Sequence, residues 1–200
     1  MVRWLLLFMA VLATPAWADE AVSPVKFHKG QFGGSLRFGL GARGILTYEN
    51  TTYCGKLDPQ AAHMFASVCT GRAPLALDLE AGYGVTGTIE LTLELRIGLE
   101  SDFGADQNSE GPRAFHVAPG ARFFFSEADR SKLFIQPMLV FDFASYQGQG
   151  NDFGVKGIEG YWIDLHRSYG IYFFISETLG FSRWLSGSFE GGVGFQGRYP

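Results

Sequence analysis

The sequence predicts an all-β fold, an eight-stranded antiparallel transmembrane β-barrel with up-and-down meander order. Three observations lead there: an export signal, apolar residues at every second position in segments long enough to cross a bilayer, and connections that are alternately long and short. The composition agrees, because 19 Phe and 27 Gly in 200 residues are unusual for a soluble domain. After the N-terminal apolar run, charges interrupt every apolar stretch, so any membrane crossing must use strands.

The first residues are typical of a secretory signal peptide. Arg3 supplies one early positive charge, an apolar run follows to about Ala13, and Ala16-Trp17-Ala18 forms an Ala-x-Ala cleavage site. The run is too short for a spanning helix, which needs about 20 apolar residues. An uncleaved anchor helix is the alternative. We expect a signal peptide over residues 1–18, a short periplasmic N-terminal segment over 19–30 and an outer-membrane barrel over 31–200.

Side chains of a strand point alternately to its two faces, so period two is the decisive signal. The clearest case is residues 89–99, where Ile and Leu alternate with Glu90, Thr92, Glu94, Arg96 and Gly98. A tilted strand crosses a membrane in about 9–11 residues, which this segment provides. Strands are expected over residues 36–48, 75–83, 89–99, 115–125, 133–146, 155–163, 170–178 and 189–199.

In two of these segments the alternation does not show which face points inward. In residues 155–163, Glu159 shares a face with Val155 and Tyr161. A bulge or an inverted register would explain this. Residues 170–178 are apolar on both faces, so their inward positions cannot be assigned.

Long polar connections (49–74, 101–113, 147–154, 180–188) alternate with short ones (84–87, 126–131, 165–169). Outer-membrane barrels have long outer loops and short periplasmic turns, and they carry aromatic girdles at both interfaces. With eight strands, both termini lie on the periplasmic side. The aromatic residues near predicted strand ends, expected in the girdles, are Phe32, Tyr48, Tyr83, Phe125, Phe134, Tyr161, Trp162, Tyr169, Trp184 and Tyr199.

The last segment, Glu190-Gly-Gly-Val-Gly-Phe-Gln-Gly-Arg-Tyr199, has apolar residues at every second place and a closing aromatic. With this terminal strand, residues 31–200 resemble the small eight-stranded outer-membrane β-barrel proteins of Gram-negative bacteria. The resemblance implies an integral protein in contact with outer-membrane lipid. It also implies insertion by the barrel-assembly machinery through Val193, Phe195 and Tyr199. Pro200 departs from the family, whose members usually end on the aromatic itself.

If the apolar faces contact lipid, the charged and polar faces meet inside the barrel. An eight-stranded interior is only just wide enough for its side chains, and buried charges must be paired. Two interpretations stay open: a salt-bridge plug, or a narrow, porin-like conduit that mildly prefers cations because acids outnumber bases. The expected interior polar network is Arg37, Arg43, Asp78, Glu80, Glu90, Glu94, Arg96, Glu100, His116, Arg122, Asp142, Glu190 and Arg198.

The two cysteines, Cys54 and Cys69, predict a disulfide, because an even number of cysteines in an exported protein suggests one. It would close a loop of about 15 residues, worth roughly 3 kcal/mol. A metal pair is the weaker interpretation, since only His63 lies between them. We expect no metal and no cofactor.

His166 and Ser168 have the spacing of the His-x-Ser pattern of barrel lipid A deacylases, but they lie in a predicted periplasmic turn. Tyr169-Gly170 also departs from that motif, so no enzyme is expected. The formal charge of −4 and the lack of basic clusters argue against nucleic acid. The predicted function is a narrow pore or structural element of the outer membrane. The alternative is a non-conducting barrel whose extracellular loops bind a partner in an envelope complex.

Overall fold

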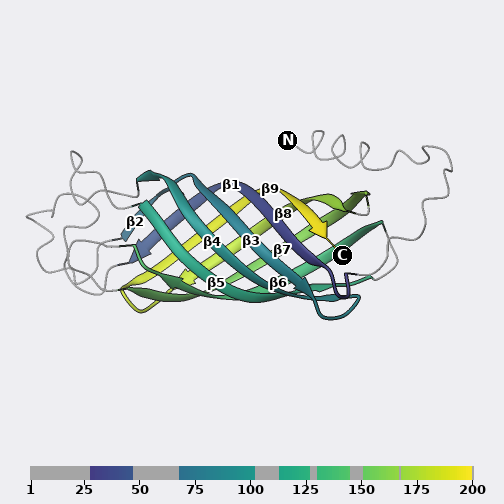
Figure 1. Ribbon diagram of the computed structural model, residues 1–200. Helices are drawn as coiled ribbons and strands as arrows, with labels where there is room; N and C mark the ends of the chain where they lie inside the picture. Colours follow the sequence, from purple (N-terminus) through teal and green to yellow (C-terminus); the bar gives the residue numbers. More distant parts are fainter. Residues whose placement is uncertain are drawn as a thin grey trace, which may run out of the picture.

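The computed structural model describes residues 28–46, 68–101, 113–126, 130–144, 151–166 and 168–199, which form one closed antiparallel barrel (Figure 1). No helix in these ranges is long and apolar enough to cross a membrane. The strands are β1 (Phe32–Leu46), β2 (Val68–Arg72), β3 (Ala76–Gly84), β4 (Ile89–Ser101), β5 (Arg113–Phe124), β6 (Ser131–Asp142), β7 (Asp152–His166), β8 (Tyr169–Gly180) and β9 (Leu185–Tyr199).

The barrel closes between its first and last strands. β1 pairs with β9 along its whole length, from Phe32↔Tyr199 to Leu46↔Leu185. On its other edge, β1 pairs with β2 near one end and with β3 near the other. β2 and β3 therefore share one place in the barrel, and the remaining strands follow in chain order. The predicted eight-stranded meander is confirmed.

A break of three residues separates β2 from β3 and shifts the register with β1 by one position, from Ala42↔Arg72 to Phe38↔Leu77. Pro74 lies in this break and has no N–H to donate to a ladder. The backbone N–H of Leu75 donates instead to the carboxylate of Glu100 at 3.0 Å. The prediction of a loop over 49–74 is wrong for β2, because its sequence Val-Cys-Thr-Gly-Arg carries no regular apolar alternation.

The two ends of the barrel differ. The "turn end" holds the start of β1, the end of β9 and the short connections 85–88, 125–130 and 167–168. The "loop end" holds the opposite strand ends, including Leu46, Ser101, Asp142 and Gly180. Strands cross from one end to the other with a strong common tilt (Figure 1).

An apolar belt covers the outside of the barrel, which exposes Leu, Ile, Val and Phe side chains from every long strand. Aromatic residues mark both of its edges. Phe32, Tyr83, Phe125, Tyr161, Tyr169 and Tyr199 are exposed at the turn end, and Phe115, Phe143 and Phe181 at the loop end. Three girdle predictions are wrong, because Phe134, Trp162 and Trp184 are buried. Tyr48 lies outside the described residues.

β7 is regular where the sequence predicted a bulge or an inverted register. Its pairing with β6 runs without a shift from Asp142↔Asp152 to Ser131↔Ile163. Its pairing with β8 is also continuous until Asp164, next to the turn. Glu159 consequently lies on the outer face with Val155 and Tyr161, all three exposed.

Candidate functional site in the barrel interior

The interior of the barrel contains charged side chains of both signs in equal number. Among the described residues, seven carboxylates and seven basic side chains are buried. All but Arg183, which lies in the 181–184 connection, occupy inward positions of the strands, opposite the exposed apolar belt. The carboxylates are Asp78, Glu80, Glu90, Glu94, Asp152, Asp164 and Glu190, and the bases are Arg37, Arg96, Arg122, Lys132, Lys156, Arg183 and Arg198.

Arg122 is the centre of the half of the interior near the turn end. Its side chain is 0% exposed. The guanidinium donates to Glu80 at 2.5 Å and to Glu90 at 3.2 Å, and it also bonds both Gln136 and Gln196. These partners come from β3, β4, β6 and β9, so one side chain ties together strands on different sides of the barrel.

Aromatic rings fill the space around this guanidinium. Its central carbon lies 5.0 Å from the ring centre of Phe134, 5.6 Å from that of Trp162 and 5.4 Å from that of Tyr172. Such cation–π contacts strengthen when water is excluded. Trp162 and Tyr172 stack at 5.0 Å with an interplanar angle of 12°. We call these three rings, with Phe124 and Phe174, the aromatic cluster.

Inward-facing glycines make room for the aromatic cluster. A Cβ on Gly194 would overlap the ring of Tyr172, and one on Gly160 would overlap the ring of Phe134. Glycine in a strand often marks a close approach of this kind. The space that these two glycines leave is therefore filled by rings from neighbouring strands.

His28, before the first strand, closes the turn end. Its side chain is 0% exposed, and its ring packs against Phe124 with centroids 4.2 Å apart. Nδ1 bonds the carboxylate of Glu90, while Nε2 lies 2.7 Å from the ammonium of Lys132. A neutral ring suits both contacts, because Nδ1–H donates to the carboxylate and Nε2 accepts from the ammonium.

Burial lowers the pKa of His28 from its usual 6.5 to about 4, with the hydrogen bond to Glu90 opposing the shift and the positive charge of Arg198 adding to it. Two backbone bonds fix this segment, from Gly30 N–H to Gly84 O at 2.7 Å and from Gly84 N–H to Gln31 O at 3.0 Å. Gly30 has φ +77°, which only glycine adopts without strain. The chain thus crosses the mouth of the barrel before it enters β1.

Glu94 is the centre of a second group of charges, near the middle of the barrel. It pairs with Arg37, accepts from Lys156 at 2.7 Å and lies 2.9 Å from Nε2 of His116. Lys156 also lies 3.4 Å from Asp78, which in turn lies 3.1 Å from Arg96. Arg96 completes the chain of contacts by pairing with Glu190.

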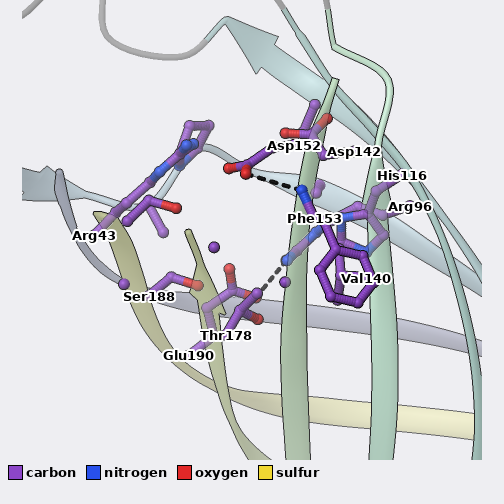
Figure 2. A pocket seen from close by; sticks show the side chains of 18 residues that line it. Arg43, Arg96, His116, Val140, Asp142, Asp152, Phe153, Thr178, Ser188 and Glu190 are labelled. Atoms are coloured by element: carbon purple, nitrogen blue, oxygen red, sulfur yellow. Dashed lines mark hydrogen bonds and ion pairs between the residues drawn. The ribbon is translucent and has the colours of Figure 1, made fainter. Parts of the chain in front are cut away.

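The interior holds a cavity at the loop end, lined by both charged and apolar residues (Figure 2). Its volume is about 80 Å³, enough for a handful of waters. Arg43, Asp142 and Ser188 line it and are partly exposed. Asp152 organises the adjacent 181–184 connection by accepting the backbone N–H groups of Ser182 at 2.8 Å and Arg183 at 3.0 Å.

The structure brings together most of the interior residues that the sequence indicated. Arg43, Glu100 and Asp142 are partly exposed near the loop end, and Glu100 pairs with Arg72 at the rim at 2.5 Å. The other ten are buried: Arg37, Asp78, Glu80, Glu90, Glu94, Arg96, His116, Arg122, Glu190 and Arg198.

Sequence reasoning missed the remaining members of the network. Lys156 and Asp164 lie on the same face of β7 as the buried Trp162. Both could have been predicted as inward if Glu159 had been assigned to the outer face. Gln136 lies on an inward position of β6 but bears no charge to attract attention. His28 had no detectable signal, because it lies in a short segment outside any alternation.

Cys54 lies outside the described residues and the side chain of Cys69 is not described, so their pairing stays a prediction. At the turn after β7, the backbone N–H of Ser168 donates to Nδ1 of His166 at 3.2 Å, and the ring stacks on Tyr169. No group of three or more possible metal ligands occurs among the described residues.

No protein-family model and no curated protein matches the sequence. Solved structures do match. Neisserial surface protein A aligns with 86% of this chain and 100% of its own at a TM-score of 0.55 and 9% identity. The N-terminal β-barrel domain of Pseudomonas aeruginosa OprF aligns with 86% of this chain and 98% of its own, at a TM-score of 0.53 and 10% identity.

The outer membrane protein AlkL aligns with 93% of this chain and 96% of its own, at a TM-score of 0.52 and 8% identity. At such low identity the three structures establish the fold alone. By its fold, this chain is a small eight-stranded β-barrel of the outer-membrane kind.

Proposed function

We propose that the protein is a non-conducting barrel of the outer membrane, with its turn end in the periplasm and its loop end offered to a partner at the cell surface. The observation that carries this proposal is the filled half of the interior around Arg122. There the guanidinium, its carboxylate and amide partners and the aromatic cluster are all buried.

A conduit needs a continuous path for water, and the packing at the turn end opposes one. Trp162 and Tyr172 are each 0% exposed. His28 lies under them, with its ring 6.2 Å from that of Trp162. The interior of an eight-stranded barrel has little room to spare, and here its narrow lumen is occupied by rings.

The charge balance also weakens the conduit hypothesis. Acids outnumbered bases in the sequence-derived set, which favoured cations. In the structure, Lys132, Lys156 and Arg183 join the buried bases, and Asp152 and Asp164 join the buried acids. Without the partly exposed Arg43, Glu100 and Asp142, the buried acids and bases of the described residues are equal in number. Paired charges hold the strands together and leave no net field to draw an ion through.

The loop end supports a binding role better than a transport role. Its cavity is lined by the Arg96–Glu190 pair and by no ring of the aromatic cluster. A rigid barrel beneath it would hold the surface loops in place, which reduces the entropy lost when a partner binds. The predicted Cys54–Cys69 disulfide would constrain one of those loops further.

Conductance in a planar bilayer tests this proposal. The refolded mature protein should give no reproducible current steps, with or without reductant, while a general porin in the same bilayers should give them. Folding must first be verified by the different gel migration of boiled and unboiled samples. Reproducible steps from the folded barrel would overturn the proposal and favour the narrow pore.

A further inference from the structure

Two carboxylates lie on the outside of the barrel, within the apolar belt. Glu159 in β7 is outward and lies two residues from Tyr161 at the turn-end edge of the belt. Glu177 in β8 is outward between Ile175 and Leu179, both exposed. The register places Glu177 opposite Gly157, two residues from Glu159, so the two carboxylates are diagonal neighbours.

Neither carboxylate has a partner in the described part of the chain. No ion pair or side-chain hydrogen bond joins Glu159 or Glu177 to another described residue. Lipid tails offer no hydrogen bonds, so the group is unsatisfied there in either protonation state. Ionisable residues within a membrane are rare, and they mark functional positions.

A groove on the same outer surface adjoins the carboxylates. It has a volume of about 880 Å³ and runs across β7, β8, β9, β1 and β2. Glu177 lines it, with Gly157, Gly187 and Ala42 as small residues and Phe189 and Leu179 as larger ones. Polar residues line it as well: Arg43, Thr70, Thr178 and Ser188. The space where Gly157 and Gly187 would carry side chains is open. Small residues let another membrane-embedded segment approach closely.

A second copy of this chain would not supply the missing charge. Among the described residues, exposed cations outside the barrel lie only at its two ends, with Arg72 and Arg113 at the loop end and Lys29 and Arg130 at the turn end. Barrels inserted in the same direction share the same depth profile. A copy would therefore set apolar side chains, or its own carboxylates, against Glu159.

We propose that the β7–β8 face of the barrel, with Glu159, Glu177 and the adjoining groove, docks a membrane-embedded segment of a different protein that presents a lysine or arginine within the apolar belt. The cation satisfies the carboxylates, and the glycine-lined groove receives the backbone beside it. This lateral surface is separate from the loop end, and it does not depend on whether the barrel conducts.

The first test measures stability without any partner, in vesicles of one zwitterionic lipid. Glu159→Leu should move the urea unfolding midpoint above that of the wild-type protein, because the substitution removes an unsatisfied group. Leu93→Glu, which places a carboxylate on the outer face of β4, should move the midpoint down. A lower midpoint for Glu159→Leu would overturn the proposal, since the carboxylate would then be satisfied by the barrel or the lipid.

The second test supplies a defined cationic segment. A synthetic polyleucine transmembrane peptide with one central lysine, and the same peptide without it, are labelled for energy transfer to the barrel. The lysine peptide should give several-fold more transfer with the wild-type barrel. The Glu159→Leu/Glu177→Leu variant should reduce that transfer to the level of the leucine peptide.

Equal transfer from the two peptides, or transfer unaffected by the double variant, would contradict the proposal. Transfer between differently labelled barrels, lost in the double variant, would overturn it in favour of a second copy. Neither test measures current, so their failure is distinguishable from the failure of the proposed function.

Discussion

The two halves of the barrel interior differ in the side chains that they contain and in how completely they are filled. Near the turn end, aromatic rings and glutamine amides surround Arg122, and the space is filled. Near the loop end, charged pairs such as Arg96–Glu190 lie beside a cavity. At the turn end, rings packed over inward glycines close the interior, whereas at the loop end the charged pairs leave space for water.

Removing a central arginine from each half gives the largest expected contrast. Arg122→Met leaves Glu80 and Glu90 buried without this partner, which costs about 3–5 kcal/mol of unfolding free energy. Arg96→Met should cost less, because water in the cavity can solvate Glu190. Urea unfolding in vesicles, followed by tryptophan fluorescence, measures both. Equal losses would remove the energetic distinction between the halves.

Overpacking the filled half is expected to have the next largest effect. Gly194→Val places a side chain where the ring of Tyr172 lies, and it should cost about 1–3 kcal/mol. Gly187→Val is the matched control in the same strand, because nothing lies within 4 Å of its Cβ position. The same unfolding measurement applies. A neutral Gly194→Val would show that the ring has space to move.

The pH dependence of His28 tests the closure of the turn end. The unfolded chain binds a proton near pH 6.5, whereas the folded protein resists it until about pH 4. Stability is therefore lost as the pH falls through this window, by about 2 kcal/mol between pH 7 and pH 5. His28→Asn should lack this part of the loss. Identical pH profiles for the two proteins would mean that His28 is not held neutral.

Substitution at the rim of the loop end should change the stability least. The Arg72–Glu100 pair joins two exposed side chains at 2.5 Å, and pairs of this kind contribute little to stability. Arg72→Met is expected to unfold within error of the wild-type protein at moderate salt. A clear loss would show that the pair supports the break between β2 and β3, where Glu100 also holds Leu75.

Period two was sufficient to predict the fold, because the outward apolar residues of six strands alternate cleanly with polar ones. The alternation did not distinguish the inner from the outer face where the interior itself is apolar. In β8, Tyr172 and Phe174 point inward while Phe173 and Ile175 point outward, so neither face was distinguishable in the sequence. The same cause placed Phe134 and Trp162 in the girdle.

The prediction of register failed in β7 for the opposite reason. Glu159 puts a charge on the outer face, where the pattern requires an apolar residue. Long-range partners were also out of reach. Arg122 and Gln196 are 74 residues apart, and only barrel closure brings them together. His28 meets Lys132 over 104 residues in the same way. Alternation assigns faces, but it carries no information about depth or about contacts across the lumen.

The accessibility of the two halves to a water-soluble reagent distinguishes a closed turn end from an open one. Ser188→Cys and Ser35→Cys place matched thiols in the loop-end and turn-end halves of a Cys54→Ser/Cys69→Ser protein, and a membrane-impermeant maleimide is applied from both sides of the bilayer. Ser188→Cys should label rapidly and Ser35→Cys only after unfolding in urea. Labelling of Ser35→Cys in the folded barrel at the rate of Ser188→Cys would contradict a closed interior.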